Sequence, residues 1–223
     1  MVSRRQSLGL IAAAACAALT GCWSPTYTYR YRLTLEVDTP DGLKSGSSVI
    51  ETKIEDRSNA WGPHESRLVS ATTRGEAVFV DLGRGRHVIA LLAMGSTGGE
   101  DPNFAALVGK PLNVQGLEDV KRLQERKGQF VLAADGVPTL ATFSDLSDPG
   151  TARLVQMDQF EAVFGPGVRF RRAWFEMTRD AVTRQAGNKL PWLHDAASVS
   201  RFWRERFMAA AFGLRAQLRP NYS

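Results

Sequence analysis

The stretch YRYRLTLEVD, residues 29–38, decides the fold class of this chain, because apolar and polar side chains alternate through it without a break. Successive side chains of a β-strand point to opposite faces of a sheet, so the alternation predicts a strand with one buried and one solvated face. TPDG, residues 39–42, follows as a turn, since proline presets one dihedral angle and glycine accepts a positive φ. A second strand over residues 47–55 then completes an antiparallel hairpin.

Further apolar runs extend this pattern along the chain. The strands that they predict cover residues 77–82, 87–93, 129–133, 139–143 and 168–177. The first two are joined by GRGR, and their near-continuous hydrophobicity predicts that both faces of each are covered. The next two are expected to pair with each other across an Asp135-Gly136 turn.

The sequence predicts two short helices and one longer helix at the end of the chain. One is predicted over residues 117–127, and a second begins at Asp158 and ends before GPG, residues 165–167. From about residue 196, apolar residues at helical spacing with arginines between them predict an amphipathic basic helix. Because strands follow strands instead of alternating with helices, the chain is expected to be an α+β protein. We expect mainly antiparallel sheet, as a sandwich or a curved meander, with two or three helices.

The first 22 residues have a different character. Arg4 and Arg5 precede an apolar run over residues 8–19, which is shorter than the roughly 20 residues that a membrane-spanning helix needs. The run ends in LTGC, residues 19–22, which resembles the lipobox of bacterial lipoproteins. We therefore expect residues 1–21 to be a signal peptide and Cys22 to carry acyl chains as the first mature residue. Residues 22–28 would form a tether, residues 29–195 a β-rich domain and residues 196–223 the terminal helix.

Lipidation would place the protein in the bacterial envelope, facing the periplasm, because a multiply acylated cysteine is a stable membrane anchor. Trp23 follows the cysteine instead of aspartate, which by the sorting rule of enteric bacteria favours the outer membrane over the inner membrane. Cys16 lies in the segment to be removed, so no disulfide is expected within the mature chain. The formal net charge of +5 includes Arg4 and Arg5. This modest charge and the compartment both argue against nucleic acid as a partner.

Four sequence segments of the mature chain carry a resemblance to known proteins. They are residues 29–37 running into 46–51, TFSDLSDP at 142–149, FGPGV at 164–168 and LPWL at 190–193. Together they resemble a set of uncharacterised proteobacterial proteins over roughly residues 29 to 193. This resemblance implies no activity and brings no catalytic residue.

Candidate residues for nucleophilic catalysis are few. The three histidines, His64, His87 and His194, lack the spacing of metal ligands. We interpret His87 as a hydrogen-bonded core residue, His64 as a solvated loop residue and His194 as a packing residue. A small hydrolase would use Ser47 or Ser48 as nucleophile with His64 as base, but these serines precede a strand and form no nucleophile elbow.

Candidate ion sites are equally weak. The glycine-rich loop of residues 95–101 offers backbone amides to an anion, or Glu100 and Asp101 to calcium, but it lacks the P-loop lysine and the EF-hand spacing. Asp145 and Asp148 would suit a hard cation, but an Asp-Pro pair more commonly caps a turn. No motif predicts a cofactor or a metal.

The terminal helix has three interpretations: docking on its own core, binding to the membrane surface, or binding to a partner protein. We favour docking, and a non-enzymatic function in which a lipid-anchored module binds or scaffolds other envelope components. The membrane, through Cys22, and an envelope protein are the expected partners. The alternative is the hydrolase, which predicts His64 or His87 within hydrogen-bond reach of Ser47, Ser48 or an acid, inside a pocket. A binding module predicts an exposed apolar patch instead.

Overall fold

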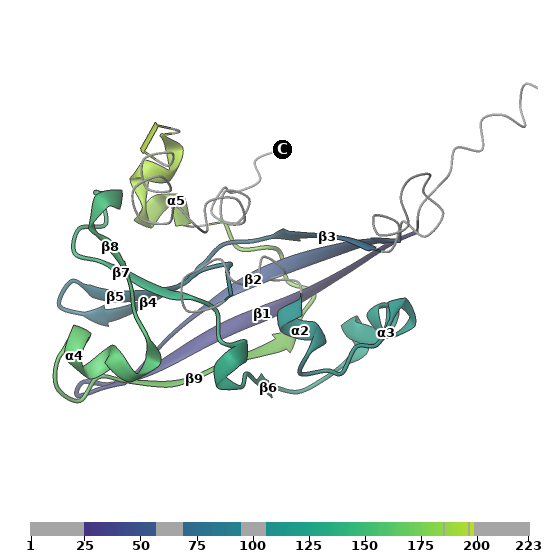
Figure 1. Ribbon diagram of the computed structural model, residues 1–223, viewed down its shortest axis with the longest axis horizontal. Helices are drawn as coiled ribbons and strands as arrows, with labels where there is room; N and C mark the ends of the chain where they lie inside the picture. The colour runs from purple at the N-terminus through teal and green to yellow at the C-terminus, as the bar shows by residue number, and fades with distance from the viewer. Residues whose placement is uncertain (1–24, 57–68, 95–105, 185, 196, 199–223) are drawn as a thin grey trace, which may run out of the picture. The chain divides into compact units, whose positions relative to one another are not determined.

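The computed structural model describes residues 25–56, 69–94, 106–184, 186–195 and 197–198 (Figure 1). The chain forms two compact units, one of residues 1–27 and 54–70, the other of residues 28–53 and 71–223. In the first unit, the amide of Asp56 donates a hydrogen bond to the carbonyl of Pro25 at 2.9 Å. The second unit contains most of two antiparallel sheets, so the predicted α+β class with a sandwich-like arrangement of sheets is confirmed.

The five-stranded sheet has the strand order β3-β2-β1-β9-β6. Its strands are β1 (Thr26–Thr39), β2 (Gly42–Asp56), β3 (Val69–Arg74), β6 (Phe130–Val131) and β9 (Arg169–Met177). The β1–β2 hairpin confirms the prediction, and Gly42 has the positive φ, 101°, that the turn requires. Both strands are longer than predicted. Residues 26–28, which were expected in the tether, therefore belong to β1.

The four-stranded sheet has the strand order β4-β5-β7-β8. Its strands are β4 (Val78–Gly83), β5 (Arg86–Ala90), β7 (Leu140–Phe143) and β8 (Ala152–Leu154). Arg84 and Gly85 connect β4 to β5 with φ angles of 58° and 73°, the positive values typical of a tight hairpin turn. The predicted β4–β5 hairpin is thus confirmed.

The predicted hairpin across Asp135-Gly136 is wrong. These residues lie in a short 3-10 helix, η3 (Ala134–Gly136), and the strands on either side of it enter different sheets. β6 pairs with β9, where the rings of Phe130 and Phe175 stack with centroids 5.3 Å apart. β7 pairs with β5 and β8 instead. Packing of a distant aromatic residue therefore outweighs the local turn signal.

The described helices are all short. Besides η3, they are α2 (Ala106–Gly109), α3 (Leu117–Arg122), η2 (Leu123–Glu125), η4 (Pro149–Thr151), η5 (Met157–Gln159), α4 (Phe160–Phe164), α5 (Ala186–Lys189) and η6 (Pro191–His194). α3 with η2 confirms the helix expected from residue 117. The helix expected from Asp158 begins earlier, because Gln156 and Gln159 form the capping box. Within the described residues, no helix is long and apolar enough to cross a membrane.

Burial follows the strand pattern with two exceptions. The apolar face of β1 is buried as predicted, but Thr34 and Glu36 on its other face are also only 8% and 7% exposed. The prediction of a fully solvated face is therefore wrong at these two residues. β5 is buried on both faces, as expected: each of its residues after Arg86 is buried. β4 is the edge strand and alternates between buried and accessible residues, so the same prediction is wrong for it.

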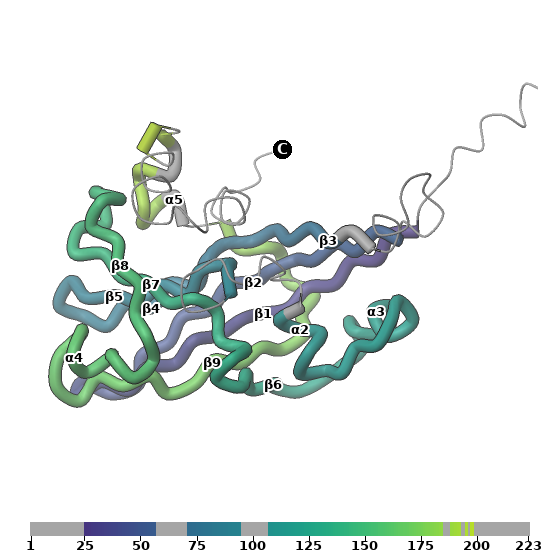
Figure 2. Tube along the Cα trace, in the orientation of Figure 1, coloured from purple at the N-terminus to yellow at the C-terminus, as the bar shows by residue number. Residues whose placement is uncertain are grey.

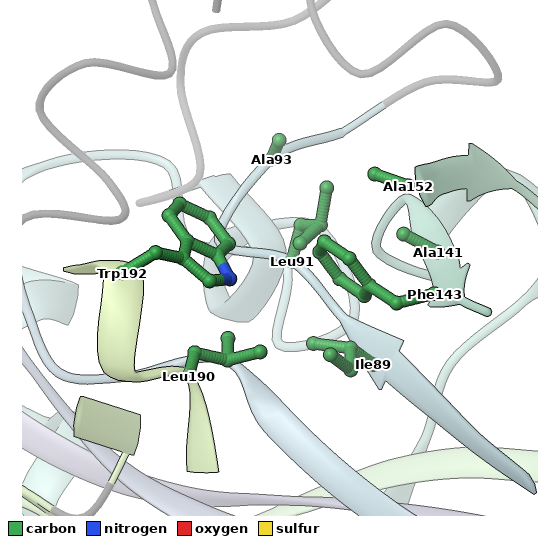
Figure 3. Packing of buried hydrophobic residues seen from close by; sticks show 8 residues of the cluster. All are labelled: Ile89, Leu91, Ala93, Ala141, Phe143, Ala152, Leu190 and Trp192. Carbon is green, nitrogen blue, oxygen red and sulfur yellow. The ribbon is translucent and has the colours of Figure 1, made fainter. Parts of the chain in front are cut away.

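A hydrophobic cluster covers one face of the four-stranded sheet (Figure 3). Leu190 and Trp192, from the segment after β9, pack there against Ile89, Phe143 and neighbouring residues. Figure 2 shows the chain leaving β9 and returning to this sheet through α5. The return brings residues near position 190 beside β4 and β5, where the candidate site lies.

Candidate functional site

A pocket lies between β2, β4, β5 and the segment that follows β9. Its empty volume is about 440 Å³, a figure that includes open solvent at the mouth. Its apolar lining is Ala77, Phe79, Ile89 and Leu190, and its polar lining is Ser47, Glu76, Thr183 and Lys189. All eight residues belong to the second compact unit.

The approach of β2 to β4 builds one wall of this pocket. A Cβ atom on Gly46 would stand 2.1 Å from the carbonyl oxygen of Phe79, so only glycine permits this contact between the two backbones. Ser47, the next residue, consequently lines the pocket together with the Phe79 side chain. The GSS sequence at 46–48, which we considered as a nucleophile site, thus has a packing reason for its glycine.

Hydrogen bonds from β2 hold the opposite wall. The amide of Val49 donates to Thr183 Oγ1 at 2.9 Å, and the amide of Thr183 donates to the carbonyl of Val49 at 3.2 Å. The segment after β9 is fixed further back by Arg32, whose guanidinium forms an ion pair with Asp180. These contacts set the path of the chain into α5 and so determine where Lys189 lies.

Lys189 carries the positive charge of the pocket. Its Nζ lies 4.1 Å from the centroid of the Phe79 ring, a cation–π distance. Among the residues that the structure describes, Lys189 forms no ion pair with a carboxylate. Glu76 lines the same pocket and is only 7% exposed. The pocket thus combines a cation above an aromatic ring with a more deeply buried carboxylate.

A second cluster of charges lies on the polar face of β1. Arg172 donates to both carboxylate oxygens of Glu36, at 2.8 and 3.0 Å, and Trp174 Nε1 donates to the same carboxylate at 2.8 Å. These donors, led by the Arg172 hydrogen bonds, lower the pKa of Glu36 against the opposing effect of burial. Every oxygen of the carboxylate is satisfied within the fold, so we assign this cluster a structural role.

The structure does not assemble the predicted serine–histidine site from the residues that it describes. Ser47 is exposed in the pocket, but its neighbour Ser48 is buried on the opposite face of β2, 1% exposed. His87 is buried between the rings of Phe79 and Phe143, and its Nε2 has no hydrogen-bond partner among the described residues. Burial lowers the pKa of His87, against a hydrogen bond that the His87 ring donates to the Gly85 backbone and that raises it. His87 is therefore the core residue that we expected, with a hydrogen bond at one ring nitrogen only. It is not the base of either serine.

Asp145 and Asp148 have the turn role that we favoured. Asp148 Oδ1 accepts from the amide of Gly150 at 2.8 Å and caps η4, while Asp145 Oδ1 accepts from the amide and hydroxyl of Ser147. The hydrogen bond from Ser147 lowers the pKa of Asp145. In the described part of the chain, no group of three or more metal-ligating side chains comes together.

Several predicted features lie outside the described residues: Cys22, His64, the loop of residues 95–101 and the terminal helix from residue 199 onward. His194 ends η6, and nothing is shown of its side chain. The exposed apolar patch expected of a binding module is not found in the described part, where Leu43 and Val131 are the only large hydrophobic residues that are exposed.

Sequence reasoning missed the cationic pocket. Phe79 falls in the strand predicted over residues 77–82, whereas Lys189 falls in no predicted element, and no local spacing relates a strand residue to a lysine far along the chain. The available signal was the LPWL segment that follows Lys189. Its apolar residues must be buried against another part of the fold, which would bring Lys189 close to that part. Comparison of the chain with protein-family models, with curated proteins and with solved structures found no match.

Proposed function

We propose that this chain is a lipid-anchored protein of the bacterial envelope that acts by binding, on the periplasmic side of the outer membrane. The observation that carries the proposal is the LTGC motif at residues 19–22, which follows a basic start and a short apolar run. Such a run suits the hydrophobic part of an export signal and is too short for a stable membrane-spanning helix.

The position of β1 supports this proposal. The strand begins at Thr26, so three residues separate it from Cys22. Four Cα–Cα steps of extended chain reach at most about 14 Å. Acyl chains on Cys22 would therefore hold the start of β1 close to the lipid headgroups, without a long linker.

The contents of the pocket support binding in preference to nucleophilic catalysis. A serine nucleophile requires a base within hydrogen-bond reach. Ser47 Oγ forms no hydrogen bond with another described residue, and the Nε2 atom of His87 is enclosed without a partner among them. The pocket offers a cation, hydroxyl groups and apolar side chains, and such groups bind a ligand noncovalently through charge, hydrogen bonds and apolar contact.

Replacement of one cysteine tests the anchor. The wild-type chain, Cys22→Ala and Cys16→Ala are expressed in a Gram-negative host, and the membrane and soluble periplasmic fractions are compared. Cys16 is the matched control, because it lies in the segment that processing would remove. We expect Cys22→Ala to leave the membrane fraction and Cys16→Ala to stay in it. Mass spectrometry of the wild-type product should show an acylated N-terminal Cys22.

Membrane association of Cys22→Ala at the wild-type level would refute the anchor, as would a mature product with an unmodified thiol at position 22. Equal loss of association in both variants would point to a general defect in export, and it would equally count against a specific role for Cys22.

A further inference from the structure

We propose that the pocket around Lys189 and Phe79 binds small amphipathic monocarboxylates, with the carboxylate at Lys189 and the apolar body against Ile89 and Leu190. This inference deepens the binding part of the proposed function and does not depend on the lipid anchor.

The charge of Lys189 is the first argument. Its ammonium group lies over the Phe79 ring at the pocket, and no described carboxylate forms an ion pair with it. An ammonium group has three hydrogens to donate, and the ring face can engage only part of them. The remaining donors of this exposed side chain are available to an anion that enters the pocket.

The floor of the pocket is the second argument. Ile89 and Leu190 are 1% and 4% exposed and belong to the hydrophobic cluster on the four-stranded sheet, against which Phe79 packs. These side chains are held by a packed core, so the floor is formed before a ligand arrives. A preformed apolar surface beside a cation favours a ligand that has both an apolar part and a negative charge.

Glu76 limits the charge of that ligand. Glu76 lines the same pocket and is nearly buried, and its negative charge would oppose a dianion such as a phosphate monoester more strongly than a monoanion. A single carboxylate at Lys189 leaves the rest of the ligand neutral. Ser47 and Thr183 add hydroxyl groups, which can bond to an amide or hydroxyl of the ligand.

Two sources offer this chemistry: a short aliphatic acid and the C-terminal carboxylate of a peptide with an apolar last residue. Hexanoate represents the first and N-acetyl-leucine the second. Hexanamide and N-acetyl-leucinamide are their neutral counterparts of nearly the same size. Titration of the full chain in a nonionic detergent, followed by the NMR signals of each probe with a protein-free detergent blank, gives the four affinities.

We expect saturable binding of at least one acid, at least about tenfold tighter than that of its amide, because a charge-assisted hydrogen bond is lost in the amide. Lys189→Met should remove this preference. Lys127→Met is the matched control, since Lys127 is exposed and lies outside the pocket. The thermal unfolding midpoints of both variants establish that each is folded.

The proposal is overturned if neither acid binds saturably, if acid and amide bind equally, or if Lys189→Met keeps the preference for the acid. The source follows from which acid binds more tightly. Failure here leaves the fractionation of Cys22→Ala unaffected, and failure of the anchor leaves these titrations unaffected, so the two outcomes are distinguishable.

Discussion

Gly46 of β2 lies directly against the backbone of Phe79 in β4, so closely that an added Cβ would stand 2.1 Å from the Phe79 carbonyl oxygen and 2.9 Å from its carbonyl carbon. The neighbour is backbone, which cannot rotate away as a flexible side chain would. The two sheets meet at this point, and their separation is therefore set by the smallest residue.

Gly46→Ala is expected to lower the free energy of unfolding by about 3 kcal/mol, because the methyl group forces β2 and β4 apart. Urea unfolding measures the loss. Gly116→Ala is the control, since Gly116 has extended backbone and nothing lies within 4 Å of its added Cβ. A Gly46→Ala protein as stable as the Gly116→Ala protein would show that the sheets do not meet at this contact.

The Glu36 carboxylate is expected to matter more to stability than its exposed neighbour on β1. Glu36→Gln loses the negative charge to which Arg172 and Trp174 donate hydrogen bonds. The free energy of unfolding should therefore fall by about 2 kcal/mol. Asp38→Asn is the matched control: Asp38 also pairs with an arginine, Arg171, but its side chain is 45% exposed. Its loss should stay below about 1 kcal/mol. Equal losses in the two variants would contradict the role of burial.

The contribution of Glu36 should also depend on pH. Because hydrogen bonds from Arg172 lower its pKa in the folded state from 4.5, the unfolded chain takes up the proton first as the pH falls. The stabilisation is thus fully present above pH 4.5 and is lost as the pH falls through the lowered folded-state value. Urea titrations of wild type and Glu36→Gln over this range should converge toward acid, and a constant difference between them would argue against the assignment.

His87 is expected to make the fold sensitive to mild acid. Burial lowers its pKa from 6.5, so the unfolded state binds a proton that the folded state excludes, and stability falls as the pH drops below 6.5. His87→Phe keeps a ring between Phe79 and Phe143 and removes the titration. Its free energy of unfolding should change less than that of wild type between about pH 7.5 and about pH 5.5. Parallel curves for the two proteins would exclude His87 as the source.

Much of the fold was predictable because its signals are local. The alternation from Tyr29 to Asp38 and the Pro40-Gly42 turn specify a hairpin through dihedral angles and side-chain direction, which depend only on neighbouring residues. The same kind of signal misled at Asp135-Gly136. There the turn residues occupy a 3-10 helix, and the strands on either side of it find partners far away in the sequence.

The candidate site was much less predictable. Ser47 drew attention as a nucleophile, and the structure places it in the pocket, but beside Phe79 and Lys189 instead of a histidine. Glu36 was expected in water because its position in β1 alternates with apolar residues. Its burial depends on Arg172 and Trp174 of β9, which no pattern within β1 reveals.

The amino-acid sequence by itself determined the antiparallel α+β class, the β1–β2 and β4–β5 hairpins and the short helix at α3, because periodicity and turn chemistry act within a few residues. It also predicts the lipidation of Cys22, because that prediction depends only on the short LTGC motif at residues 19–22. Only the tertiary structure decided the partner of β6, the burial of Glu36 and the meeting of Lys189 with Phe79. Each of these depends on contacts between distant segments, whose stability comes from packing that no local pattern contains.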